Sequence, residues 1–262
     1  MNPFTKISVI LILVGFLSIS AAASSSLGSA NAWEFCATGD ITSKTVMNKM
    51  KAYDCKVDVL LGDYYGKEST FVAGFKETGV PLLAACGNHD TCSKVIKYDN
   101  IKTGDKTFYG FRWNNVGFLI LNTEQSISSQ KAASEKVLAK WQNDTAIDLI
   151  VLAQHKPAVT NSGAHHKETE AKGYRQQFDL WHQQYPKIKL ALSGHNHNFL
   201  VCEPTTPNML FITEGTGGRT PYPIGALGDD NCGQGLSGSK YNGFTIIDVN
   251  GNAFTYKHVN AQ

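Results

Sequence analysis

The chain has 262 residues, of which 42% are hydrophobic and 18% are charged, with 24 glycines and 8 prolines. This mixture excludes a collagen-like, coiled-coil or wholly disordered protein and supplies enough apolar residues for a buried core. The formal net charge of +2, from 24 basic and 22 acidic residues, is too small to predict nucleic acid as a partner.

The N-terminal segment has the pattern of a secretory signal. Lys6 precedes an apolar stretch over 7–23, which is followed by small residues and an Ala-x-Ala site that ends at Ala32. We therefore expect a cleaved signal peptide over 1–32, cut after Ala32 or nearer Ala23, and a secreted or otherwise extracytoplasmic mature chain. The alternative is an uncleaved membrane anchor, although the apolar stretch is shorter than the ~20 residues of a spanning helix. After cleavage we expect no stable association with a membrane.

The mature chain, 33–262, is predicted to form one α/β domain, because it contains no internal repeat and no Pro-rich linker. Short apolar runs first alternate with amphipathic helical patterns. The predicted strands are 33–37, 57–61, 81–86, 116–121, 147–153 and 188–192, and the predicted helices are 43–53, 128–141 and 168–184. Strands dominate after Gly194, at 199–202, 209–213, 241–249 and 253–259, with a hairpin turn at Asn250-Gly251 and a long loop over 215–238. The oligomeric state stays open.

All six cysteines lie in the mature part, and an even number in an exported chain predicts disulfides. Proximity in the sequence favours pairing Cys86 with Cys92 and Cys202 with Cys232, but the sequence alone does not fix the connectivity. The competing interpretation, a cysteine metal site, is disfavoured because no C-x-x-C pair is present.

Five of the predicted strands are followed by side chains that can bind metals. These segments are Gly39-Asp40, Gly62-Asp63, Gly87-Asn88-His89-Asp90, His155 and Gly194-His195-Asn196-His197. In an open α/β sheet, ligands bind beyond the carboxyl ends of the strands, so we expect these loops to share one edge. Carboxylate, amide and imidazole donors without thiolate favour Fe, Zn or Mn over Ca. The pattern therefore predicts a polynuclear metal site.

The same motifs, in this order over 33–199, resemble those of the calcineurin-like metallophosphoesterases, and within them the purple acid phosphatase-like branch. The Gly-Asn-His-Asp and Gly-His-Asn-His blocks are specific, whereas the two Gly-Asp blocks are weak alone. The resemblance implies an α/β sandwich of two mixed β-sheets flanked by helices. It also implies a hydrolase of phosphoric esters with two metal ions, Fe, Zn or Mn, about 3.5 to 4 Å apart.

The resemblance further implies which residues bind the metals. The expected ligands are Asp40 and His197 for the first metal, Asn88, His155 and His195 for the second, and Asp63 as a bridge between them.

Other residues are implied to act on the substrate. His89 is expected to face the substrate phosphate and to help protonate the leaving group, with Asp90 orienting His89. Asn88 and His89 are expected to bind the substrate. The loop after His155 can add another histidine, and of His165 and His166 we favour His165 as a substrate-binding residue.

One departure from the family concerns the first metal. Most members carry a histidine where this chain has Thr42, and the purple branch compensates with a tyrosine where this chain has Gly66. Tyr64 and Tyr65 lie beside that position but out of register. The first metal either lacks one protein ligand, is weakly held, or takes Tyr65 through a shifted loop; a rim or packing role for Tyr65 is the alternative.

The function implied is a secreted metal-dependent phosphoesterase that hydrolyses small phosphate monoesters with a hydroxide activated by the two metals. No serine or Walker nucleotide-binding motif competes with this interpretation. The alternatives are a phosphodiesterase or nucleotidase that uses the same centre, and a non-catalytic secreted module with a degraded first metal site. The glycine-rich segment from Gly215 to Arg219 is expected to be a turn, although its amides could face an anion, and the role of Arg219 stays open.

Overall fold

The computed structural model describes residues 32–98, 107–162, 164–165, 169–225, 232–233 and 235–261. The expected signal peptide lies outside the described residues except for Ala32, at which the first strand begins. Across the described part of the chain, no helix has the length and apolar character needed to span a bilayer.

The first of two mixed sheets has five strands in the order β11-β10-β1-β2-β3. Its strands are β1 (Ala32–Thr38), β2 (Asp58–Leu60), β3 (Leu82–Ala84), β10 (Gly243–Asn250) and β11 (Ala253–Asn260). β1, β2 and β3 run parallel to one another, whereas β10 pairs antiparallel with β1 and with β11. The predicted hairpin is confirmed, because β10 and β11 are joined through Gly251, which has a φ of 63°.

The second sheet has six strands in the order β4-β5-β6-β7-β9-β8. Its strands are β4 (Tyr109–Trp113), β5 (Val116–Ile120), β6 (Leu149–Ala153), β7 (Ile188–Ser193), β8 (Phe199–Cys202) and β9 (Leu210–Glu214). The four central strands, β5, β6, β7 and β9, are parallel, and the edge strands β4 and β8 are antiparallel to them.

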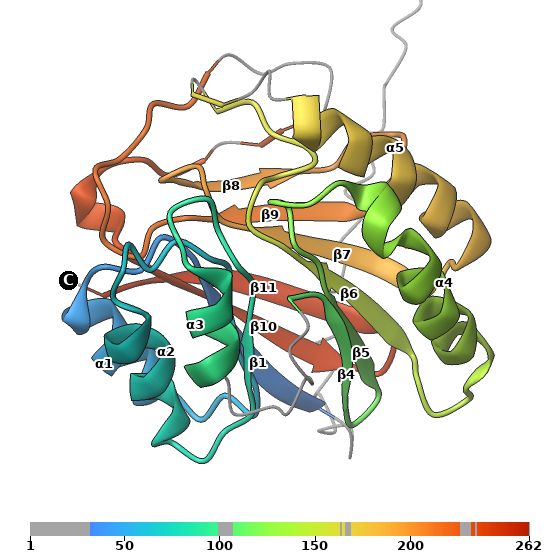
Figure 1. The fold of residues 1–262 in the computed structure, drawn as a ribbon, viewed down its shortest axis with the longest axis horizontal. Helices are drawn as coiled ribbons and strands as arrows, with labels where there is room; N and C mark the ends of the chain where they lie inside the picture. The colour runs from blue at the N-terminus through green and yellow to red at the C-terminus, as the bar shows by residue number, and fades with distance from the viewer. Residues whose placement is uncertain are drawn as a thin grey trace, which may run out of the picture.

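The sheets pack face to face and helices cover their outer faces, as Figure 1 shows. Buried side chains of both sheets form the inner core, where the rings of Phe35 and Phe118 meet edge to face with centroids 5.0 Å apart. The helices are α1 (Lys44–Lys51), α2 (Glu68–Lys76) and α3 (Cys92–Tyr98) beside the first sheet, α4 (Ile127–Asn143) and α5 (Thr169–Gln184) on the second, and the short 3₁₀ helix η1 (Ser239–Tyr241). The expected α/β sandwich is confirmed.

Besides the short 3₁₀ helix η1, three elements were not predicted from the sequence. β4 is an edge strand with no fully buried side chain, so its apolar pattern is weak. α2 contains Gly74, and its N-cap residue, Lys67, makes no side-chain capping hydrogen bond, so the helix lacks the usual start signal. α3 has seven residues and begins at a disulfide-bonded cysteine, Cys92.

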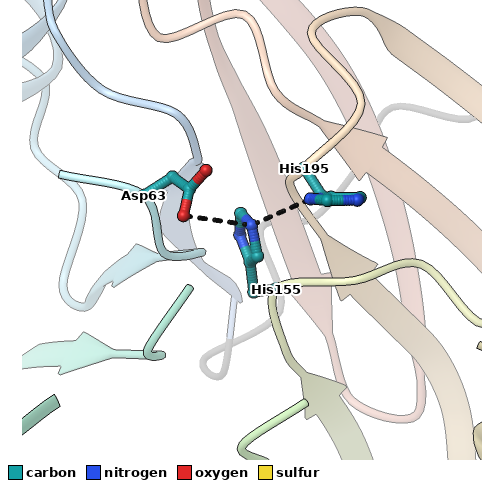
Figure 2. A group of neighbouring side chains, drawn as sticks. All are labelled: Asp63, His155 and His195. Atoms are coloured by element: carbon teal, nitrogen blue, oxygen red, sulfur yellow. Dashed lines mark hydrogen bonds and ion pairs between the residues drawn. The ribbon is translucent and has the colours of Figure 1, made fainter. Parts of the chain in front are cut away.

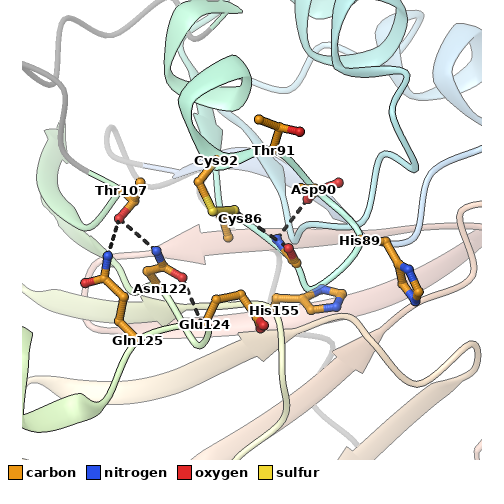
Figure 3. The surroundings of a disulfide bond; sticks show 12 residues. Cys86, His89, Asp90, Thr91, Cys92, Thr107, Asn122, Glu124, Gln125 and His155 are labelled. Atoms are coloured by element: carbon orange, nitrogen blue, oxygen red, sulfur yellow. Dashed lines mark hydrogen bonds between the residues drawn. A yellow bond between two sulfur atoms is a disulfide. The ribbon is translucent and has the colours of Figure 1, made fainter.

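All six cysteines form disulfides, which leaves no thiolate for a metal. The two favoured pairs, Cys86–Cys92 and Cys202–Cys232, are confirmed, and Cys36 pairs with Cys55. The Cys86–Cys92 bond closes the loop after β3 that carries His89 and Asp90 (Figure 3).

A buried polar link connects the two sheets next to the Asp40 loop. Glu214, at the end of β9, accepts hydrogen bonds from Thr245 of β10 (2.5 Å) and His258 of β11 (2.9 Å). The other ring nitrogen of His258 faces the carbonyl of Tyr241 at 2.8 Å, so both ring nitrogens face acceptors, an arrangement that favours the imidazolium. Burial opposes that charge, but Glu214 outweighs it and raises the pKa of His258. Because the Glu214 carbonyl also accepts the Gly39 N–H at 2.8 Å, this link fixes the segment that leads to Asp40.

Candidate metal centre

Both sheets contribute loops to the predicted site. Asp40 follows β1, Asp63 and Tyr65 follow β2, Asn88 and His89 follow β3, His155 follows β6, and His195 and His197 follow β7. All five are strands of the parallel parts of the sheets, so their carboxyl ends face one edge of the sandwich. The structure therefore brings together the loops that the sequence predicted to share an edge.

The backbone of these loops is held in an unusual conformation. Six non-glycine residues in the described chain have positive φ, and four of them are predicted metal ligands, namely Asp40 (56°), Asp63 (60°), Tyr65 (52°) and His195 (68°). Left-handed backbone is unfavourable for residues with a Cβ and persists where surrounding contacts impose it, typically at functional sites. The fold thus expends conformational energy to direct these side chains.

Two glycines make room for the ligands. A Cβ at Gly87 would lie 2.2 Å from Asp63 Oδ1, and a Cβ at Gly62, which has a φ of 87°, would lie 2.7 Å from His155 Nδ1. Both positions therefore require glycine, as the Gly-Asp and Gly-Asn-His-Asp motifs indicated.

Four side chains, which we call the Asp63 group, direct ligand atoms at one another. His155 Nε2 lies 3.3 Å from Asp63 Oδ1, 3.0 Å from Asn88 Oδ1 and 3.2 Å from His195 Nδ1. Figure 2 shows three of them, Asp63, His155 and His195, converging from separate loops. His155 is fully buried and Asp63 and His195 are nearly so, whereas Asn88 is exposed at the rim.

The donor chemistry of the Asp63 group fits a cation. His155 Nδ1 donates to the carbonyl of Leu61 at 2.7 Å, so in the neutral ring Nε2 carries a lone pair. That lone pair faces carboxylate, amide and imidazole ligand atoms, which are the donors that Zn, Fe and Mn accept. Anchoring of the second ring nitrogen on a backbone carbonyl is also the usual support of a metal-binding histidine.

Three further side chains form what we call the Asp40 group. His197 Nε2 lies 3.4 Å from Asp40 Oδ1 and 3.2 Å from the Tyr65 hydroxyl. His197 Nδ1 donates to the carbonyl of Thr220 at 2.7 Å, which again leaves Nε2 available as a ligand. Asp40 Oδ1 is buried and has no hydrogen-bond partner, although Oδ2 accepts the His195 N–H at 2.7 Å. An unpartnered buried carboxylate oxygen beside an imidazole lone pair is costly unless a cation joins them.

The departure from the family pattern at the first metal has a structural explanation. Tyr64 points into the core, where its hydroxyl donates to the Ala85 carbonyl at 2.9 Å. The left-handed backbone at Tyr65 and Gly66 turns the loop so that the Tyr65 hydroxyl reaches His197. The structure therefore brings Tyr65, and not Tyr64, to the Asp40 group.

Asp63 adjoins both groups. Besides its contact with His155, Asp63 lies close enough to Tyr65 of the Asp40 group to raise the pKa of the Tyr65 hydroxyl. Burial opposes ionisation of Asp63, but the hydrogen bond and charge of His155 outweigh it and hold its pKa below the usual range. Burial likewise opposes a charge on His155, yet Asp63 and Asp40 raise its pKa to about 9. Without a cation, His155 therefore carries the balancing proton that a metal would displace.

Burial also affects the ionisation of the Asp40 carboxyl and of the Tyr65 hydroxyl. Burial raises the pKa of Asp40, against the opposing effect of the neighbouring His197 ring. Burial, followed by the Asp40 and Asp63 carboxylates, raises the pKa of the Tyr65 hydroxyl above its ordinary value. Ionisation of this tyrosine therefore requires a cation nearby.

Asp90 has different contacts from those expected. Instead of orienting the His89 ring, its carboxylate accepts the backbone N–H groups of Asp63 (2.7 Å), Tyr64 (2.6 Å) and Gly87 (2.8 Å). Asp90 thus ties the β2 loop to the β3 loop. The His89 ring is exposed and stacks on the Tyr65 ring with centroids 4.7 Å apart, while its backbone N–H donates to Asp63 Oδ1 at 2.9 Å.

The glycine-rich segment forms a turn, and the N–H groups of Gly215, Thr216 and Gly217 donate hydrogen bonds within the protein. The Gly217 N–H donates to the Gly39 carbonyl, and the Gly217 carbonyl accepts the N–H groups of Thr42 and Ser43, all at 3.0 Å. The Gly215 N–H donates to the backbone carbonyl of Asn198 at 3.0 Å. These bonds fasten the turn to the Asp40 loop and argue against an anion cradle.

Aromatic residues complete the rim. His165 is exposed, and its ring centroid lies 4.3 Å from that of His195, whereas His166 lies outside the described residues. Tyr222 stacks on His197 with centroids 4.0 Å apart and an interplanar angle of 20°. Tyr222 carried no signal in the sequence, because it belongs to an irregular segment with no metal-binding motif.

Comparison with known proteins identifies the family. The sequence profile of the calcineurin-like phosphoesterases matches residues 37–199, which include all five ligand-bearing loops. The chain belongs to the calcineurin-like phosphoesterase family. Membership of the calcineurin-like phosphoesterases implies a binuclear metal centre, and the family is named for the hydrolysis of phosphoric esters. No curated protein matches the sequence significantly.

Several solved structures share the fold at low sequence identity. The purple acid phosphatase PPD1 of yellow lupin (Lupinus luteus) is 16% identical, with a TM-score of 0.67 over 88% of this chain, which spans 52% of the lupin enzyme. GAP50 of Plasmodium, described as the anchor in the inner membrane complex, is 17% identical with a TM-score of 0.61, covering 88% of this chain and 85% of that one. A dimetal phosphatase of Danio rerio is 10% identical with a TM-score of 0.52, and the match covers 88% of this chain and 96% of the Danio chain.

Replacing Tyr65 tests the Asp40 group of this phosphoesterase. We expect Tyr65→Phe to lower the affinity for the first metal by at least about tenfold, because the hydroxyl that faces His197 is lost. With ferric iron loaded, the visible tyrosinate-to-iron absorption should vanish as well. Metal content and the absorption spectrum measure both effects.

Tyr64→Phe is the matched control, since it removes the adjacent hydroxyl, which contacts the Ala85 carbonyl in the core. It should leave the metal content and the spectrum unchanged. Unaltered affinity for both metals in Tyr65→Phe would show that Tyr65 is only a rim residue.

Proposed function

We propose that this protein is a secreted, metal-dependent phosphatase that hydrolyses small phosphate monoesters. The observation that carries the proposal is the juxtaposition of the Asp63 group and the Asp40 group, with Asp63 bonded to His155 of the first and close to Tyr65 of the second. We assign Asp63 as the bridge, Asp40, His197 and Tyr65 to the first metal, and Asn88, His155 and His195 to the second. The absence of thiolate donors favours Fe, Zn or Mn.

Two bound cations would neutralise charge on a phosphate ester and lower the pKa of a water molecule to near neutrality. The chain itself holds the ligands in place, because His155 and His197 are each anchored on a backbone carbonyl through Nδ1. Asn88 and His89 are at the exposed rim, where an entering ester meets them first.

His89 is proposed as the general acid. Its backbone N–H is fixed on Asp63 and its ring is fixed by stacking on Tyr65, so the imidazole is exposed but oriented. A protonated imidazole in this position can give its proton to a departing alkoxide. His165, whose ring lies beside His195, is proposed as a second substrate-binding residue.

Secretion is supported by three disulfides, since such bonds persist mainly in oxidising compartments. The domain then comprises 33–262 after removal of the signal over 1–32.

The test is a comparison of nitrophenyl phosphate with its bis-ester, using the purified full chain loaded with each candidate metal. We expect about two metal equivalents, a preference for the monoester, and loss of turnover on chelation that metal restores. His89→Ala should lower kcat by roughly 10²- to 10⁴-fold and leave metal content unchanged.

Other outcomes would contradict the proposal. A preference for the bis-ester would make the protein a phosphodiesterase built on the same centre. One metal equivalent without turnover would indicate a non-catalytic module, a role that the description of the Plasmodium structure as an anchor makes worth testing.

A further inference from the structure

Arg219 differs from the other arginines in its contacts. The chain has only two others: Arg112, whose Nη1 lies 3.1 Å from the Asp144 carboxylate, and Arg175, which donates to the Thr206 carbonyl at 3.4 Å. Arg219 Nε is shielded from solvent and has no hydrogen-bond partner. Among the residues that the structure describes, no carboxylate pairs with its guanidinium.

The surroundings of Arg219 place its charge at the rim of the metal centre. Its guanidinium carbon lies 3.9 Å from the centroid of the Tyr65 ring, the ring whose hydroxyl reaches His197. It is also close enough to Tyr222, the ring stacked on His197, to counteract in part the rise in that tyrosine's pKa caused by burial and Asp40. The cation therefore lies near both rings that flank His197.

The backbone that carries Arg219 is fixed before any ligand arrives. Gly217 exchanges three hydrogen bonds with the Asp40 loop, and the Thr220 carbonyl accepts the His197 Nδ1–H. Arg219 lies between these two anchored residues. Its side chain is thereby held in relation to the Asp40 group, which lowers the entropy lost on binding a ligand.

A planar guanidinium without an acceptor, beside a site for phosphate esters, matches phosphate chemically. Arginine presents several N–H donors in a fixed fork that fits two oxygens of a phosphate group. A phosphate monoester has three unesterified oxygens and two negative charges near neutral pH, whereas a diester has two such oxygens and one charge. The third unesterified oxygen, which only a monoester has, is the one that the Arg219 guanidinium at the rim can bind.

We propose that Arg219 binds an unesterified phosphoryl oxygen of the substrate and so selects monoesters over diesters. This inference rests on the proposed function and names the residue that sets its substrate class. Stacking on Tyr65 orients the guanidinium, and its Nε–H, which no acceptor among the described residues engages, remains for the phosphate.

The test compares Arg219→Gln and Arg219→Lys with wild type, each loaded with metal and assayed for metal content. Calorimetric titration with inorganic phosphate should show a 10- to 100-fold loss of affinity for Arg219→Gln, as expected for a charge-assisted hydrogen bond. Arg219→Lys, which keeps the charge, should lose less. In Arg219→Gln, kcat/KM should fall at least about tenfold for nitrophenyl phosphate and about threefold or less for the bis-ester.

Arg112→Gln is the matched control, because it removes a surface arginine and should change neither phosphate affinity nor ester preference. The inference is overturned if Arg219→Gln binds phosphate within twofold of wild type at equal metal content, or if both esters are affected equally. A wild type that hydrolyses neither ester refutes the proposed function, and the phosphate titrations still decide the role of Arg219. A wild type that binds no phosphate overturns the inference directly.

Discussion

Asp63→Asn is expected to reduce kcat/KM for a phosphate monoester by about 10³-fold or more and to remove at least one metal equivalent. Asp63 contacts His155 of the one ligand group and lies close to Tyr65 of the other, so neutralising it would withdraw the charged ligand that we assign to both metals. Loss of metal charge at the reacting phosphate costs several kcal/mol, and each ~1.4 kcal/mol is tenfold in rate. Asparagine still accepts the His89 N–H that Asp63 Oδ1 now accepts, so the loop should keep its shape.

Asp58→Asn is the control, because Asp58 lies on β2, the strand that leads to Asp63. Burial raises the pKa of Asp58 to about 7, against the opposing charge of Lys51, so a neutral amide is close to its native state. The metal content and activity of Asp58→Asn should match those of the wild type. Full activity in Asp63→Asn would remove the basis for the bridging assignment.

Asp90→Ala is expected to lower the free energy of unfolding of the metal-free protein by about 2–5 kcal/mol. Three backbone N–H groups, those of Asp63, Tyr64 and Gly87, would lose their acceptor, and each unsatisfied donor costs about 1–3 kcal/mol unless water reaches it. Release of the β2 loop from the β3 loop should also misplace Asp63 and Asn88, so metal affinity and turnover fall together. Urea unfolding and metal titration measure the two effects.

His89→Ala separates this structural role from a catalytic one. The exposed His89 ring should affect turnover but change stability by less than about 0.5 kcal/mol. If Asp90→Ala were as stable as His89→Ala and failed only in turnover, Asp90 would instead act through the His89 side chain, as its place in the sequence motif indicated.

Much of the site was predictable because parallel strands direct their carboxyl ends to one edge. Asp40, Asp63, His155 and His195 each follow a buried strand, and the sequence pattern of those strands is strong. The close contacts that Gly62 makes with His155 and that Gly87 makes with Asp63 were likewise indicated by the glycine that precedes a predicted ligand in each motif.

The remaining features depend on loop conformations that no periodicity encodes. Tyr65 reaches His197 only because Tyr65 and Gly66 are left-handed, a choice that the residue types allow but do not impose. The Asp90 carboxylate faces backbone amides, which are invisible in a sequence motif. Arg219 and the buried Glu214–His258 pair become neighbours of the site only through tertiary contacts.

Anomalous diffraction from crystals of the metal-loaded protein tests the central claim most directly. We predict two peaks at the absorption edge of the metal, both adjoining Asp63. One should lie about 2.0–2.3 Å from His155 and His195 nitrogens, and the other within the same range of ligand atoms of Asp40, His197 and Tyr65. Peaks elsewhere on the molecule, or a single peak that Asp63 does not contact, would contradict the account.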